Sequence, residues 1–122
     1  MNIFVDGSGF SPKTKTSRAY ILSEDKKIIV DIVKNEEKTN NEMEYWALIG
    51  ALKHASEGDT IYTDSKLLVG QCTQNWKCNF DHLKVLKDLC IPTIKEKKIK
   101  LVWIPREENL AGKFLEKELG HI

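Results

Sequence analysis

The first third of the chain constrains the fold most, because it holds three short β-rich runs separated by short polar segments. These runs are Asn2–Asp6, Arg18–Leu22 and Ile28–Val33. The first is followed at once by Gly7-Ser8-Gly9, which predicts a break in the strand. Three consecutive strands with short connections predict an antiparallel meander.

After residue 38 the hydrophobic period changes from that of strands to that of helices. Thr39, Asn40 and Asn41 offer N-cap side chains, and an apolar stripe at helical spacing follows at Ala47, Leu48, Ala51, Leu52 and Ala55. The rest of the chain predicts alternating elements: a helix over 43–55, a strand over 60–64, a short helix from 65, a polar connection over 70–78, a helix around 83–90 closed by Pro92, a strand over 99–104 and a helix over 109–119. We therefore expect one α/β domain over residues 1–122, with a five-stranded mixed sheet flanked by helices.

The composition is that of an ordinary globular protein. A chain of 122 residues can bury a core without disulfides, and its net charge of +1 offers no bulk attraction to nucleic acid. Cys72, Cys78 and Cys90 are odd in number and lack metal-ligand spacing, so we expect reduced thiols. With no apolar run long enough for a membrane span and no signal peptide before the first strand, we expect a soluble, cytoplasmic protein.

Three acidic residues stand where their side chains could share one site. Asp6 and Asp64 each end an apolar run, and ligand sites collect at strand ends in open α/β sheets. Glu44 lies one turn before Leu48, on the stripe predicted to be buried, where a carboxylate is costly unless it meets a cation. Each acid alone is typical of a cap or a surface charge, but the three together favour a metal site. Glu42 is a weaker candidate because it points to a different helix face.

The ligand chemistry indicates which metal such a site would take. Oxygen ligands without His or Cys partners favour Mg²⁺ or Mn²⁺. Two such ions about 3.5–4 Å apart can activate a water and stabilise the leaving oxygen of a phosphodiester. That chemistry needs no Ser, Cys or His nucleophile.

At these residues the sequence closely resembles ribonuclease HI, in a compact form without the family's basic protrusion. The motifs occur in order over nearly the whole chain: Val5-Asp6-Gly7-Ser8, Thr39-Asn40-Asn41-Glu42-Met43-Glu44, Tyr62-Thr63-Asp64-Ser65, Trp76-Lys77-Cys78-Asn79 and Pro105-Arg106-Glu107-Glu108-Asn109. The resemblance implies a ribonuclease H-like fold and an endonuclease that hydrolyses the RNA strand of RNA–DNA hybrids and leaves 5′-phosphates. It also implies two Mg²⁺ or Mn²⁺ ions. No obligate protein partner is evident from the sequence.

The resemblance further implies roles for individual residues. Asp6, Glu44 and Asp64 would be the catalytic, metal-binding carboxylates. The residues that would contact substrate are Gly7, Ser8, Thr39, Asn40, Asn41, Trp76, Lys77 and Asn79.

These contacts would divide between the two strands of the hybrid. The backbone of Gly7 and the pair Asn40 and Asn41 would read the minor groove, where 2′-hydroxyls distinguish RNA from DNA. Thr39 and Asn79 would hold a phosphate of the DNA strand.

Trp76 and Lys77 would lie along the same DNA backbone. A core position is the alternative for Trp76, but its polar neighbours favour exposure.

Three features depart from the family's pattern. The position four residues after Asn109, where the family carries a fourth carboxylate, holds Lys113; either Glu116 substitutes, or the Lys113 ammonium supplies charge where a second ion is weakly held. The mobile histidine of many relatives is absent, since Arg106 follows the proline directly. The segment over 70–83 is too short for the basic substrate-binding helix of some relatives, so we expect modest affinity that weakens with salt.

Two other functions remain open from the sequence. The chain could be a ribonuclease H-like module that binds nucleic acid but cleaves weakly, because the fourth ligand is gone. It could also be a nuclease of the same fold that acts on DNA. Three clustered acids favour catalysis over binding alone, and the Thr-Asn-Asn motif favours hybrids over DNA.

Overall fold

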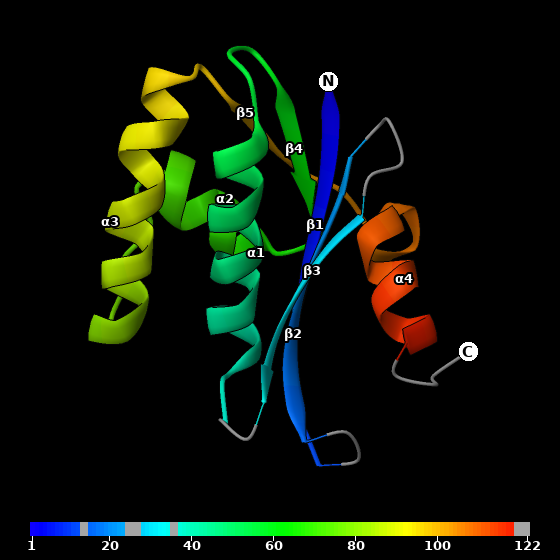
Figure 1. Cartoon of the computed structure of the whole chain (residues 1–122). Helices are drawn as coiled ribbons and strands as arrows, with labels where there is room; N and C mark the ends of the chain where they lie inside the picture. Colours follow the sequence, from blue (N-terminus) through cyan, green and yellow to red (C-terminus); the bar gives the residue numbers. More distant parts are fainter. Residues whose placement is uncertain (13–14, 24–27, 35–36, 119–122) are drawn as a thin grey trace.

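One mixed sheet with helices on both of its faces organises the protein (Figure 1). The computed structural model describes residues 1–12, 15–23, 28–34 and 37–118. Its elements are β1 (Asn2–Ser11), β2 (Thr16–Ser23), β3 (Ile28–Lys34), α1 (Asn40–His54), β4 (Thr60–Thr63), α2 (Lys66–Thr73), α3 (Asp81–Glu96), β5 (Lys100–Trp103), a 3₁₀ turn (Arg106–Glu108) and α4 (Leu110–Glu118). The expected α/β class is confirmed.

The five strands lie in the order β3-β2-β1-β4-β5. The pairs β1–β2 and β2–β3 are antiparallel, which confirms the predicted meander. The pairs β1–β4 and β4–β5 are parallel, so β1 lies between the antiparallel and parallel halves of the sheet. The first and fourth strands are therefore neighbours, as the proposed meeting of Asp6 and Asp64 requires.

Helix α1 covers one face of the sheet beside α3, and α4 packs on the opposite face (Figure 1). The predicted stripe of α1 is buried in the core together with Ile3, Val5 and Ile61. Burial of this apolar stripe holds α1 against β1. Among the described helices, none combines the length and apolar character that a bilayer span needs.

Helix α1 begins three residues earlier than the expected start at residue 43, because its N-terminus is fully capped. The Thr39 hydroxyl accepts the Glu42 N–H at 3.1 Å, and the Glu42 carboxylate accepts the Thr39 N–H at 3.2 Å. This reciprocal arrangement is a capping box, which satisfies two backbone donors of the first turn. Glu42 therefore acts as a cap, which agrees with its being the weaker candidate for a metal ligand.

Two other expected boundaries are wrong because tertiary contacts override local signals. Strand β1 does not break at Gly7-Ser8-Gly9 but continues to Ser11, because Gly7 lies directly on the backbone of α1. Helix α2 continues through Thr73, into the segment expected to be a polar connection from residue 70.

The proline at position 92 does not close α3, which continues to Glu96. A proline removes one backbone donor from a helix, but α3 keeps a buried face on both sides of it, with Leu86, Cys90 and Ile94 in the core. Tertiary packing therefore outweighs the local cost. The seven residues between α2 and α3 hold no further helix, in agreement with the compact form expected without a basic protrusion.

Candidate metal centre

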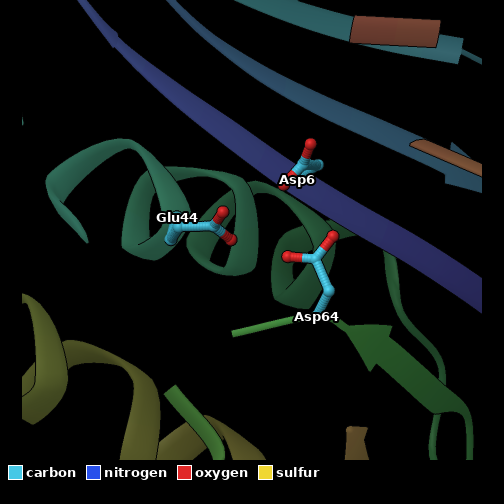
Figure 2. A group of neighbouring side chains, drawn as sticks. All are labelled: Asp6, Glu44 and Asp64. Carbon is cyan, nitrogen blue, oxygen red and sulfur yellow. The ribbon is translucent and has the colours of Figure 1, made fainter. Parts of the chain in front are cut away.

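Three carboxylates converge from three separate elements (Figure 2). Asp6 comes from β1, Glu44 from the first turns of α1, and Asp64 from the residue that follows β4. One ligand oxygen from each lies within 4.8 Å of the others. Asp6 is 6% and Glu44 8% exposed. The three acids expected to share a site are therefore close together.

The register of the parallel pair β1–β4 explains why the two aspartates meet. Phe4 lies opposite Tyr62 in the last paired position. Two residues further along each chain come Asp6 and Asp64. Because parallel strands advance together, both side chains emerge at the same edge, just past the point where the pairing ends.

Gly7 brings Glu44 to the aspartates. A Cβ at position 7 would lie 2.2 Å from the carbonyl carbon of Met43 and 2.4 Å from the backbone nitrogen of Glu44. Only glycine allows this close approach of β1 to α1. Since successive strand residues alternate in direction, Gly7 faces the backbone of α1, whereas the Asp6 carboxylate lies between Glu44 and Gly112 of α4.

The crowding of acids changes their protonation. Burial raises the pKa of Asp6 to about 6, and the charge of Asp64 adds to the rise, while the Glu44 carboxyl, the Gly7 amide and the Arg106 guanidinium oppose it. Burial and the nearby Asp6 also raise the pKa of Glu44 well above its usual range. Burial and mutual repulsion thus make the charged forms of Asp6 and Glu44 energetically costly.

A fully buried asparagine orients Asp64. The Asn109 side-chain Nδ2 donates to Asp64 Oδ2 at 3.1 Å and to the Val5 carbonyl at 2.9 Å. Its Oδ1 accepts the Ala111 N–H at 3.2 Å and so caps the start of α4. The sequence predicts only a motif position and a helix start at Asn109. Its location in the Pro-Arg-Glu-Glu-Asn motif is the signal that points to a further role.

A tryptophan fixes the backbone of the same aspartate. The Trp103 indole Nε1 donates to the Asp64 carbonyl at 3.0 Å, and Ile104 N–H donates to the Thr63 carbonyl at 2.9 Å. Ser65, directly after Asp64, caps α2 by accepting the Leu68 N–H at 3.2 Å. These three hydrogen bonds therefore fix the backbone at the end of β4.

The donor set fits a hard divalent cation. Glu44 Oε2 is buried and has no hydrogen-bond partner among the described residues, so a lone pair on a buried carboxylate is left unsatisfied. Such a group is costly unless a cation or proton meets it. Position 112 on α4, a glycine, leaves open the space beside the Asp6 and Asp64 oxygens. Oxygen ligands alone favour Mg²⁺ or Mn²⁺.

Several of the residues that the resemblance assigned to substrate lie at or near the start of α1. Asn40 and Asn41 are exposed in the first turn, and Asn40 Oδ1 accepts the Gly9 N–H at 2.6 Å, which ties β1 to the helix start. Thr39 is exposed, but its hydroxyl is already used as the N-cap of α1. Ser8 is partly buried beside Gly7.

Trp76 is 45% exposed. A Cβ at Gly70 would lie 2.1 Å from that ring, so the indole lies flat on α2 at a position without a side chain. Asn75 has a left-handed backbone (φ 62°), which asparagine tolerates well, and turns the chain back so that Trp76 N–H donates to the Gly70 carbonyl at 3.0 Å. Lys77 and Asn79 beside it are exposed.

The fourth-carboxylate position gives no acid to the cluster. Lys113 is exposed on α4. The side chain of Glu116 lies outside what the structure describes, so its substitution for the missing acid stays a prediction. His54 and His82 are exposed, whereas His121 lies outside the described residues.

Comparison with known proteins adds four findings. The RNase H family model matches residues 1–112. The N-terminal RNase H domain of Rv2228c from Mycobacterium tuberculosis, solved as a maltose-binding protein fusion, has a similar fold with a TM-score of 0.69 and 22% identity, over 98% of this chain and 97% of that one. RNase H1 from the halophilic archaeon Halobacterium salinarum gives a TM-score of 0.70 and 22% identity over 100% of both chains. No curated protein matches the chain in sequence.

Proposed function

The chain belongs to the RNase H family, and on that premise we propose that it is a metal-dependent endoribonuclease that hydrolyses the RNA strand of RNA–DNA hybrids. The family and fold support a nuclease of the RNase H type. The dependence on metal, the hybrid substrate and the 5′-phosphate product are proposals that go beyond family membership.

One observation carries it: carboxylates from β1, α1 and the end of β4 meet within 4.8 Å around an unsatisfied oxygen of Glu44. Three acids held this close repel one another and destabilise the fold unless something positive lies between them. A purely structural role would not explain a cluster that costs stability. Bound divalent cations would relieve the repulsion between the carboxylates, and this relief would contribute to the binding affinity for the metal.

The chain's own residues divide the work. Asp6, Glu44 and Asp64 would hold Mg²⁺ or Mn²⁺, with two ions in the proposed arrangement. When bound, the ions would activate a water and stabilise the leaving oxygen of the scissile phosphodiester. Asn109 holds the Asp64 carboxylate in position, and the capped end of β4 keeps it from turning away. In the hydrolysis, water oxygen bonds to phosphorus, the bond to the RNA 3′-oxygen breaks and that oxygen takes a proton, which leaves a 5′-phosphate and a 3′-hydroxyl.

Substrate would lie across the surface that joins the cluster to α2. The exposed Asn40 and Asn41 would reach 2′-hydroxyls in the minor groove. The outer face of Trp76, with Lys77, would contact the DNA backbone, and Asn79 with Thr39 would hold one of its phosphates. The Thr39 hydroxyl accepts the Glu42 N–H and donates to Glu42 Oε1 at 3.4 Å, so it would have to redirect its proton to bind a phosphate.

We also propose that the protein works in the cytoplasm, as one domain over residues 1–122 and without an obligate protein partner. Its three cysteines are free thiols in the structure, and a reducing compartment keeps thiols in that state.

The test is a cleavage assay with matched substrates. Labelled RNA–DNA hybrid, double-stranded RNA, duplex DNA and single-stranded RNA are incubated with Mg²⁺ or Mn²⁺, using the native protein and Asp64→Asn. The variant keeps the size of the side chain and removes its charge. We expect cleavage of the hybrid alone, with 5′-phosphate ends, and its loss in the variant.

Two outcomes would contradict the proposal. Tight binding to the hybrid without cleavage in either ion would indicate the binding module. Cleavage of duplex DNA would indicate a DNA nuclease of the same fold.

A further inference from the structure

Helix α4 approaches the carboxylates through a residue that has no side chain. An ideal Cβ at Gly112 would lie 3.1 Å from Asp6 Oδ2 and 3.6 Å from Asp64 Oδ2. These atoms belong to the two aspartates that the sheet register brings together. The third of the three nearest atoms is the Asp6 carboxyl carbon, at 3.6 Å. The space that a side chain would fill therefore faces the acid pair.

Backbone geometry does not explain this glycine. Gly112 lies in the first turn of α4, and its φ is not in the left-handed region that requires glycine. Inside a helix, glycine is less favourable than alanine, because it loses more backbone freedom on folding. The helix itself would therefore be more stable with alanine at position 112. A methyl group there would instead disturb the Asp6–Asp64 pair.

The anchoring of α4 makes the placement of Gly112 rigid. Asn109 bonds Asp64 and Val5 with its amide nitrogen and caps α4 with its oxygen, so the helix start and Asp64 are fixed to one another. The next residue, Lys113, is exposed and brings no carboxylate to the cluster. On the side of α4, the two aspartates therefore face a position without a side chain. The family carries its fourth carboxylate at the next position, which here holds Lys113.

We propose that Gly112 keeps this side of the Asp6–Asp64 pair open for a hydrated divalent cation, with water ligands in the space that a side chain at position 112 would occupy. This inference rests on the proposed metal site and deepens it. Waters replace the missing fourth carboxylate as ligands, which suits Mg²⁺, because that ion gives up its hydration shell reluctantly. The chain thereby completes an ion's coordination without an acidic residue from α4.

The variant Gly112→Ala tests the proposal, with Leu110→Ala as the matched control. Leu110 lies in the same helical turn and is exposed, with no described contact to the acids. Mn²⁺ and Mg²⁺ binding is measured by titration calorimetry, and thermal unfolding is measured in chelator. We expect Gly112→Ala to weaken Mn²⁺ binding about tenfold or more while its metal-free melting temperature stays at or above that of the native chain. Leu110→Ala should bind Mn²⁺ as the native chain does.

Equal Mn²⁺ affinity in Gly112→Ala and the native chain would overturn the inference. That result would leave the proposed function intact, because the native chain would still bind the ion. If instead the native chain binds no Mn²⁺, or Asp64→Asn binds it unchanged, the proposed metal site itself fails.

A measurement on the native protein keeps the inference testable even if the variant does not fold. Bound Mn²⁺ speeds the relaxation of exchanging water protons in proportion to the waters that it keeps. We expect a strong enhancement from the native complex. A weak enhancement, typical of an ion enclosed by protein ligands, would contradict a hydrated ion beside Gly112.

Discussion

Asn109 is completely buried and donates a hydrogen bond from its amide nitrogen to the Asp64 carboxylate at 3.1 Å. The same side chain bonds the Val5 carbonyl and caps α4. One residue near the C-terminus therefore connects both strands that carry the aspartates with the helix that faces them. This makes Asn109 a positioning residue for Asp64.

Asn109→Ala should lower the free energy of unfolding by about 2–4 kcal/mol, because it leaves a buried carbonyl and a helix N–H without partners. It should also weaken Mg²⁺ binding, since Asp64 loses its orienting donor. Denaturant unfolding and titration calorimetry measure the two effects. Asn109→Asp is the matched variant, because it keeps the shape of the side chain but adds a charge beside Asp64. Its metal-free form should be less stable than the native chain, and added Mg²⁺ should restore more of its stability.

If Asn109→Ala binds Mg²⁺ as tightly as the native chain, the positioning role of Asn109 is wrong.

Gly7→Ala should prevent the close approach of β1 and α1. The added methyl carbon would lie 2.2 Å from the Met43 backbone, and neither element can move without disturbing the core. We expect a loss of about 3 kcal/mol or more in the free energy of unfolding. Ser8→Ala, at the next and partly buried position, is the control and should change stability little. Circular dichroism during urea unfolding measures both, and similar midpoints for the two variants would refute the packing argument.

Gly70→Ala should act on substrate binding through Trp76. Its methyl group would occupy the place of the indole, 2.1 Å from the ring, and push Trp76 off α2. If Trp76 contacts the DNA strand, the KM for hybrid should rise about tenfold, as for Trp76→Ala, while kcat changes little, because the carboxylates are untouched. Gln74→Ala, an exposed change in the same connection, should leave both constants unchanged. A fall in kcat with an unchanged KM would place Trp76 outside the substrate surface.

Much of the fold and the candidate site could be predicted, because the strongest signals are local. Strand and helix periods gave the element order, and polar residues at the ends of apolar runs marked Asp6 and Asp64. The position of Glu44 on an otherwise apolar stripe marked the third acid, and the structure brings all three together.

The wrong boundaries share a physical cause. Gly7 reads as a breaker in isolation, and only the neighbouring helix shows that its missing side chain permits a continuous strand. Pro92 reads as a helix end, but the core contacts of Cys90 and Ile94 carry α3 past it. Asn109 and Gly112 act through residues about fifty or a hundred positions away. Such long-range relationships leave no periodic trace in a single sequence.

The replacement for the fourth carboxylate gives a further test. If Glu116 substitutes, Glu116→Gln should cut turnover severely, since a ligand charge is lost. If the exposed Lys113 ammonium supplies the charge instead, Lys113→Ala should raise the Mg²⁺ concentration needed for half-maximal activity. Metal titrations of cleavage rate distinguish the two. A hydrated ion beside Gly112 predicts that neither variant abolishes Mn²⁺ binding, which calorimetry checks independently of turnover.

The raised pKa of Asp6 predicts how pH links stability to metal binding. The pKa of this carboxyl is about 6 in the folded chain against an ordinary value of 3.8, so the native state holds the proton more tightly than the unfolded state. The resulting stability is fully present below pH 3.8 and is lost as pH rises through 6. The raised pKa of Glu44 contributes a loss of stability in the same direction. Metal-free protein should therefore become less stable on going from pH 5 to 7.5, as thermal unfolding in chelator would show.

Divalent cations should reverse that trend, because protons and metal compete for the same oxygens. Mg²⁺ affinity should rise with pH up to about 6, by roughly tenfold per pH unit for each proton displaced. The stabilisation by added Mg²⁺ should thus be small at pH 5 and large at pH 7.5. Asp6→Asn, which cannot ionise, should lose most of both effects. Arg106→Gln should shift the rise in affinity to higher pH, since the Arg106 guanidinium lowers the pKa of Asp6. A Mg²⁺ affinity that stays constant across this pH range would mean that the cation binds elsewhere than at Asp6 and Glu44.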